Sequence, residues 1–277
     1  GMGGAFYIDQ AHVICRNVVF DSNRAIGGNG GNTQTIVEGG EGGIPSHGLA
    51  THGGWGGRSG PTGTGGGDGS FGAGGGGGVA EWILHHKADR GGNGGFGGGG
   101  GGGGGGAWSS EIGGQGGPFA GKGADGFRAS SYANGGGGGG AGLGGAIFVT
   151  SNGSLLVEHC TFKNNKARGG YGGTYAQKGN GKGGAIFAMD GASVSLLLAS
   201  FENNQASDAA SSSYDTTGGL SDSIDLYGVV TILQPTPTPT ATQTPTPTNT
   251  LIPTPTPTTT PILTSHIDVT TLTDECN

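Results

Sequence analysis

The chain has 277 residues, of which 71 are glycine and only 11 % are charged. Glycine falls in doublets and long runs, which excludes collagen, and no apolar run reaches the roughly 20 residues of a membrane-spanning helix. The net charge of −7 argues against a nucleic-acid partner, because phosphate binding needs a basic face.

Three segments share one pattern and are predicted to be repeats: residues 1–25, 142–167 and 181–206. Each begins with Gly-x-Gly-Gly-Ala and ends with an apolar strand, Phe-x-x-Asn and Ala. Alternating apolar residues with one phase switch predict two short strands separated by a bend. The residues expected to point inward are Val13, Cys15, Val18 and Phe20, then Leu155, Val157, Cys160 and Phe162, then Val194, Leu196, Ala199 and Phe201. Such a unit cannot bury its apolar face alone, so the copies should stack as consecutive coils.

The Gly-Gly-Ala and Phe-x-x-Asn elements resemble the repeats of chlamydial polymorphic outer-membrane proteins. This resemblance implies an all-β fold, a right-handed parallel β-helix, with a first coil at 1–26 and two more coils plus a strand region at 142–234. It also implies tight corners at the glycine pairs that begin at Gly3, Gly144 and Gly183. The asparagines Asn23, Asn165 and Asn204 would stack at the next corner, bonding along the column and to turn backbone.

Between the first two coils lies a glycine-rich insertion, residues 27–141. Ordering glycine costs more backbone entropy than ordering any other residue, and few large apolar residues are present to offset it. The composition therefore favours a flexible loop. The alternative is a packed bundle of polyglycine II helices, whose backbones approach closely because they lack Cβ atoms. An ice- or surface-binding polyglycine module is a less favoured alternative function, because the glycines lack a strict three-residue period.

From Pro235 the chain becomes almost entirely proline and threonine, so residues 235–263 are predicted to be an extended spacer. Residues 264–277 resemble the opening of a CSLREA region, the start of a further, truncated surface domain. That resemblance implies that the chain is a piece of a larger multi-unit protein.

Several short motifs suggest chemistry but are better explained by composition or packing. Residues 116–122 resemble a phosphate-binding loop, yet the magnesium-binding Ser or Thr is missing. Residues 121–127 resemble a single calcium-binding nonapeptide, which needs consecutive copies. Four histidines fit no zinc spacing: His47, His52, His85 and His86. Cys15 and Cys160 are expected to be small buried hydrophobes, and Asn152-Gly153-Ser154 is a turn signal as much as a glycosylation site.

We therefore expect a non-enzymatic secreted or cell-surface module with a structural or adhesive role. Its partners would be surface glycans or proteins, with edge-to-edge self-association through open strands. No catalytic, cofactor or metal residue is predicted. The enzymatic alternative is a pectate lyase-like or polygalacturonase-like β-helix, which would need converging carboxylates. The outward charged residues instead fall in two columns without converging carboxylates. One column is Asp21, Lys163 and Glu202, and the other is Arg16, Glu158 and the uncharged Leu197.

Overall fold

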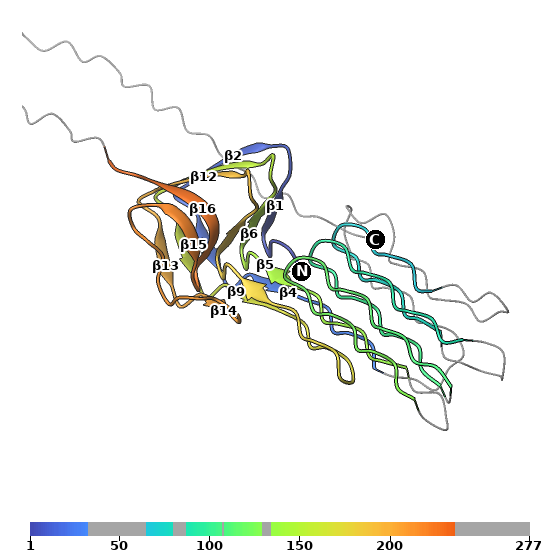
Figure 1. Cartoon of the computed structure of the whole chain (residues 1–277). Coiled ribbons are helices and arrows are strands. Elements are labelled where there is room, and N and C mark those ends of the chain that lie inside the picture. The colour runs from blue at the N-terminus through green and yellow to red at the C-terminus, as the bar shows by residue number, and fades with distance from the viewer. Residues whose placement is uncertain (33–64, 80–86, 107, 129–133, 236–277) are drawn as a thin grey trace, which may run out of the picture. The chain divides into compact units, whose positions relative to one another are not determined.

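The computed structural model describes residues 1–32, 65–79, 87–106, 108–128 and 134–235, and these contain strands but no helix (Figure 1). No helix able to cross a membrane occurs among them. The Pro/Thr-rich segment after Pro235, the C-terminal segment and the four histidines of the insertion lie outside the described residues.

The strands form a parallel β-helix whose coils are the three predicted repeats. Coil 1 contains β1 (Phe6–Ile8), β2 (His12–Arg16), β3 (Val19–Asp21) and β4 (Arg24–Ile26). Coil 2 contains β5 (Gly142–Leu143), β6 (Ile147–Val149), β7 (Ser154–Glu158), β8 (Thr161–Lys163) and β9 (Lys166–Arg168). Coil 3 contains β10 (Gly181–Lys182), β11 (Ile186–Ala188), β12 (Ser193–Leu197), β13 (Ser200–Glu202) and β14 (Gln205–Ala206). Equivalent strands of successive coils pair in parallel, so the predicted stacking is confirmed.

A fourth, partial turn covers β11 and β12 of coil 3, whereas β13 and β14 pair on one side only among the described residues. The strand β16 (Leu226–Leu233) pairs in parallel first with β11 and then with β12. On its other side it pairs antiparallel with β15 (Gly219–Asp222). Residues 227–230 of β16 are thereby closed to a further parallel strand, which is a recognised way of protecting an edge strand.

The interior is a set of apolar columns. Phe20, Phe162 and Phe201 stack with ring centroids 4.7 and 5.2 Å apart, as expected from the spacing of paired strands. The inward positions of coil 2 are fully buried. Val18 is the exception to the predicted pattern, because it is 37 % exposed. It occupies the column of buried Cys160, but no described coil covers coil 1 on that side.

The corners are made where the repeats carry glycine and asparagine. Gly3, Gly144 and Gly183 have φ of 61–65°, the left-handed region that glycine enters without steric cost. At the next corner the asparagines form a directional ladder. Asn23 donates its backbone N–H and its side-chain amide to Oδ1 of Asn165, and Asn165 does the same to Asn204, at 2.9–3.0 Å. The ladder implied by the resemblance is therefore present.

The ladder ends on a carboxylate that the sequence did not reveal. The side-chain amide of Asn204 donates to Oδ1 of Asp225 at 2.9 Å. Asp225 occupies the position of Ala185 at the start of the fourth turn, since Leu226 pairs with Ile186. A residue that only accepts hydrogen bonds is suited to finish a column in which every member donates forward.

Burial raises the pKa of the Asp225 carboxyl above its ordinary value of 3.8, in spite of the bond from Asn204. A raised folded-state pKa means that ionisation costs stability, a cost absent below pH 3.8 and complete above the folded pKa. Asp225→Asn keeps the acceptor oxygen without the charge. We expect it to match the wild type in acid and to become increasingly more stable as the pH rises to neutrality. Urea unfolding at several pH values measures this difference, and the exposed Asp190→Asn is the control. A stability difference that stays flat with pH would contradict the assignment.

Leu198 occupies a strained corner. Its φ is +52°, in the same column as Asn17 and His159, and its side chain is 54 % exposed. Asparagine tolerates this backbone conformation better than leucine does, so Leu198→Asn should stabilise the protein by about 0.5–1 kcal/mol. Thermal unfolding checks this, with the exposed strand residue Leu220→Asn as a control expected to bring no gain. A fall in melting temperature on Leu198→Asn would show that the corner is not strained.

The two outward charge columns lie in the predicted register. Lys163 pairs with Asp21 at 3.3 Å, and Arg16 forms an ion pair with Glu158. The like-charged Arg24 and Lys166 also face each other, and nothing in the structure explains that pairing. These are mostly exposed pairs, so they fix register more than they add stability.

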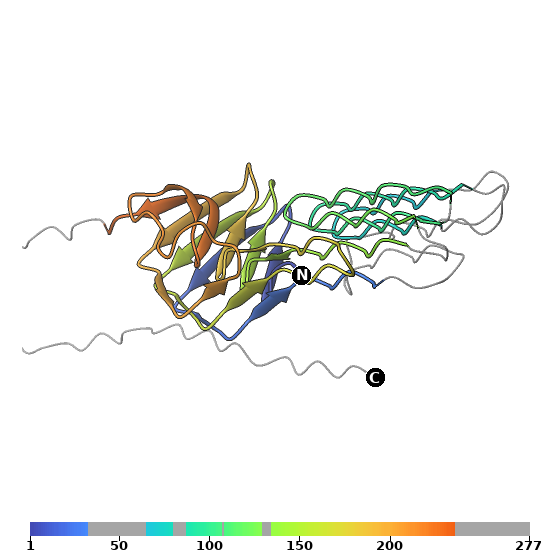
Figure 2. The ribbon, with the colours of Figure 1, turned by 60° about the horizontal axis from the view of Figure 1, so that its bottom comes forward.

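The described parts of the insertion form an ordered bundle of extended chains (Figure 2). Amides at every third residue bond to a neighbouring segment at 2.8–3.0 Å, as in the donations of Gly66, Gly69, Gly72, Gly75 and Gly78 to Arg90, Asn93, Phe96, Gly99 and Gly102. A second set runs in the same way from Gly91, Gly94, Gly97, Gly100 and Gly103 to residues 112–124. This three-residue period is that of a polyproline II-type helix.

The flexible loop favoured by composition is therefore wrong for these residues, and the polyglycine II bundle is correct. The physical reason is the density of the packing. A Cβ added at Gly98, Gly101, Gly104 or Gly123 would overlap a backbone carbonyl oxygen of an adjacent segment. Only glycine lets the backbones approach this closely, and the interchain hydrogen bonds then offset its entropy cost.

Candidate functional site: an aromatic junction and the hollow beside it

The sheet that contains β1, β6, β11 and β16 carries a ladder of four aromatic rings on its outer face. Tyr7, Phe148, Phe187 and Tyr227 lie on β1, β6, β11 and β16, each stacked on the next. Their centroids are 5.2, 5.1 and 4.7 Å apart, and the rings are within 10° of parallel. The register of the parallel strands places them opposite one another.

The glycine bundle meets this ladder through phenylalanines at the turns of its hairpins. Phe71 stacks on Phe96 at 5.1 Å, and Phe119 is edge-on to Phe96 at 5.9 Å. Phe96 contacts Phe148 edge-on, and Phe119 contacts both Phe187 and Tyr227, at 5.1–6.2 Å. Edge-to-face pairs of this kind are favourable beyond the area they bury. The junction therefore fastens the bundle to the β-helix.

The sequence contains a signal for this junction. Strands β6 and β11 read Ile-Phe-Val and Ile-Phe-Ala, and all three residues of each are buried. Ile147 and Val149 belong to the interior, whereas Phe148 belongs to the cluster on the outer face. An unbroken apolar run in a parallel strand indicates burial on both faces. Solenoid strands covered only on the inside would alternate instead.

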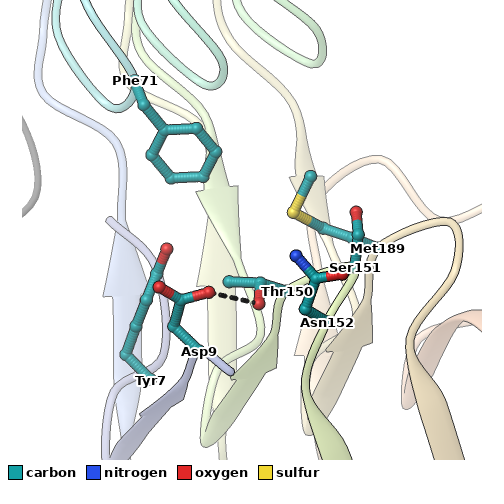
Figure 3. Close-up of a pocket in the computed structure, with 7 residues that line it drawn as sticks. All are labelled: Tyr7, Asp9, Phe71, Thr150, Ser151, Asn152 and Met189. Carbon is teal, nitrogen blue, oxygen red and sulfur yellow. Dashed lines mark hydrogen bonds between the residues drawn. The ribbon is translucent and has the colours of Figure 1, made fainter. Parts of the chain in front are cut away.

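A hollow of about 260 Å³ opens beside the junction (Figure 3). Aromatic side chains form its upper and left parts in this view, and polar groups from the turns after β1 and β6 lie below. Its lining residues are Tyr7, Asp9, Phe71, Thr150, Ser151, Asn152 and Met189. Asp9, Thr150 and Met189 follow three paired strands directly, which explains why they lie side by side.

The hollow has a defined hydrogen-bonding character. Thr150 donates its hydroxyl to Oδ1 of Asp9 at 2.7 Å, which orients the carboxylate. Burial, together with the nearby Asp9 carboxylate, raises the pKa of Tyr7 to about 12. The Tyr7 hydroxyl therefore stays protonated at neutral pH and is available as a donor. An aromatic wall, a carboxylate acceptor and an exposed amide at Asn152 suit a ligand that carries several hydroxyl groups on an apolar ring face.

The motifs that the sequence analysis set aside have structural roles here. The amide of Lys122 bonds to the Gln177 side chain, and Asp125 accepts from the Gly113 amide and pairs with Lys122. Cys15 and Cys160 are buried free thiols. Asn152 lies in a turn closed by the bond from the Gly153 amide to the Thr150 carbonyl.

The hollow was not predicted from the sequence, because its residues come from three separate coils and a hairpin of the insertion. Among the described residues no group of three or more His, Cys, Asp or Glu is placed to hold a metal ion. Comparison with family models, with curated proteins and with solved structures finds no match for this chain.

Proposed function

We propose that this chain is a non-enzymatic adhesive module of the cell surface or extracellular space that binds glycans at the hollow. The observation that carries the proposal is that the Tyr7 and Phe71 rings line the same hollow as the Asp9 carboxylate, which Thr150 orients. Sugars present an apolar ring face to aromatic side chains and hydroxyl groups to carboxylates and amides. Shallow hollows with these groups suit binding of an exposed terminal sugar.

Rigidity supports the same proposal. The hollow is bounded by the β-helix on one side and by a bundle hairpin on the other. The aromatic junction holds these two parts together, so its lining is preorganised and little order has to be gained on binding. A β-helix and a polyglycine bundle also have many backbone hydrogen bonds and few flexible side chains, which suits a load-bearing surface structure.

A glycan array followed by calorimetric titration of the best ligand tests this function. Asp9→Ala should weaken binding about tenfold or more, because a hydrogen bond to a charged group contributes about 1.5–3 kcal/mol. Asp190→Ala is the matched control, since Asp190 is an exposed aspartate in the turn that follows Met189 but does not line the hollow. No glycan binding by the wild type, or equal losses in both variants, would contradict the proposal. Release of reducing sugar from pectin by the purified wild type would favour the lyase or hydrolase alternative.

One observation favours a second candidate, surface or ice binding by the polyglycine bundle. The glycines do not recur strictly at every third residue, but the bundle's hydrogen bonds do. Gly28 and Gly31 also lie exposed on the bundle, with no described atom near their missing Cβ positions. A thermal hysteresis measurement on the full chain tests this candidate, and a freezing point equal to that of a control protein would exclude it.

A further inference from the structure

Coil 1 ends the described β-helix with an open edge. Among the described residues, β1, β2, β3 and β4 each pair on one side only, with β6, β7, β8 and β9. An unpaired edge of parallel strands presents free N–H and C=O groups to any chain that can pair with them.

The inner columns are uncovered at this edge. Phe6 and Val18 are 45 % and 37 % exposed, whereas the residues beneath them in coil 2, Ile147 and Cys160, are at most 1 % exposed. The end of the interior at Phe6 and Val18 is therefore apolar, and another layer could bury it. Three further apolar side chains of coil 1 are exposed at outward positions, those of Ile14, Val19 and Ile26.

The asparagine ladder gives this edge a direction. Each asparagine donates from its backbone N–H and its side-chain amide to Oδ1 of the next coil. Among the described residues none donates in this way to Oδ1 of Asn23, which is the first member. At the other end Asp225 closes the ladder and β16 covers β11 and β12 of coil 3. The strands β13 and β14 also pair on one side only among the described residues, so the two ends differ in the ladder and in the cover over β11 and β12. At the coil 1 end, Oδ1 of Asn23 can accept the pair of donors that a repeat asparagine offers.

We propose that the open edge of coil 1 is a docking site for a further β-helical coil of the same repeat class, running in the same sense. That coil would add parallel strands to β1–β4, cover Phe6 and Val18, and present an asparagine whose amides donate to Asn23. A second copy docked head to head is disfavoured. Its own Asn23 Oδ1, which is an acceptor, would face the Asn23 Oδ1 of the first copy, which is also an acceptor. At the capped end of a second copy, the side-chain amide of Asn204 already donates to the Phe162 carbonyl and to Asp225, so it has no proton left for Asn23.

The test adds such a coil by tethering residues 142–180 ahead of Gly1 in the full chain. Gly1 corresponds to Gly142 and Gly181, because Met2 bridges Leu143 and Gly142 pairs with Gly181. The new connection from Asn180 to Gly1 therefore repeats the native one from Asn180 to Gly181. A second version replaces the added residues 169–180 with a Gly-Ser linker of equal length, in case the extra hairpin does not fit.

We expect the melting temperature to rise by about 5 °C or more and the edge amides of β2 and β3 to exchange at least about tenfold more slowly. Asn165→Ala within the added unit should remove most of both gains, whereas Asn164→Gly within it should not. Unchanged exchange in both tethered versions would overturn the proposal, and so would an Asn165→Ala unit that works equally well. A dimer of the untethered chain that Val19→Lys dissolves would also overturn it, since the occupant would then be a second copy.

Discussion

Gly101→Ala is expected to disrupt the glycine bundle and to cost about 3 kcal/mol or more in unfolding free energy. The methyl group would overlap the Gly76 carbonyl oxygen, which is backbone and cannot swing away as a side chain could. Gly101 also donates to Gly92 and accepts from Gly114, so a shift of this segment would strain bonds to two neighbours. Urea unfolding, followed by far-ultraviolet circular dichroism, measures the loss of unfolding free energy.

Gly31→Ala is the matched control for this substitution. No described atom lies within 4 Å of the position that its Cβ would take, so the bundle should accommodate it. Alanine also lowers the entropy of the unfolded chain, so the control is expected to be neutral or slightly stabilising. Equal stability of the Gly101→Ala and Gly31→Ala proteins would mean that the bundle is not packed as described.

Asn165→Ala is expected to be the most damaging substitution in the β-helix, at roughly 3 kcal/mol or more. The Asn165 side chain is fully buried and has four hydrogen bonds, two accepted from Asn23 and one donated to each of Phe20 and Asn204. Its loss leaves buried polar groups on two other coils without partners, and each such group costs about 1–3 kcal/mol.

Chemical denaturation of the Asn165→Ala protein gives the magnitude, and Asn164→Gly provides the comparison. Asn164 is the adjacent, exposed residue with φ of +56°, where glycine is tolerated. Its one side-chain bond goes to the exposed Asp21, so we expect a loss below about 1 kcal/mol. If both variants were equally mild, the asparagine ladder would be a packing feature and not a source of stability.

The β-helix could be predicted from the sequence because its determinants are local and repeated. The spacing from Gly-Gly-Ala to Phe-x-x-Asn recurs in each coil, and it places Phe20, Phe162 and Phe201 in one column. Val18 was misjudged because a repeat pattern describes a coil within a stack and does not show which coil is last. Asp225 was missed because the fourth turn lacks the Gly-Gly-Ala element that identifies the other three.

The bundle and the hollow could not be deduced in the same way. Whether a glycine-rich segment orders depends on backbone contacts between distant residues, such as Gly114 with Gly101, and side-chain patterns carry little information about these. The structure shows the order in the phenylalanines at the hairpin turns, which pair with one another, and two of them, Phe96 and Phe119, also contact aromatic rings of the β-helix. The hollow follows from that meeting and has no motif of its own.

The central claim is that the glycine-rich insertion is a folded part of the molecule, fastened to the β-helix. NMR-detected amide exchange tests it most directly, by comparing Gly94, Gly100 and Gly103 in the bundle with Leu155 and Val157 in coil 2. Each of these three glycine amides donates to a carbonyl of a neighbouring segment, so we expect protection within about tenfold of the coil 2 amides. Exchange of the glycine amides at the rate of an unstructured chain, with the coil 2 amides still protected, would contradict the account.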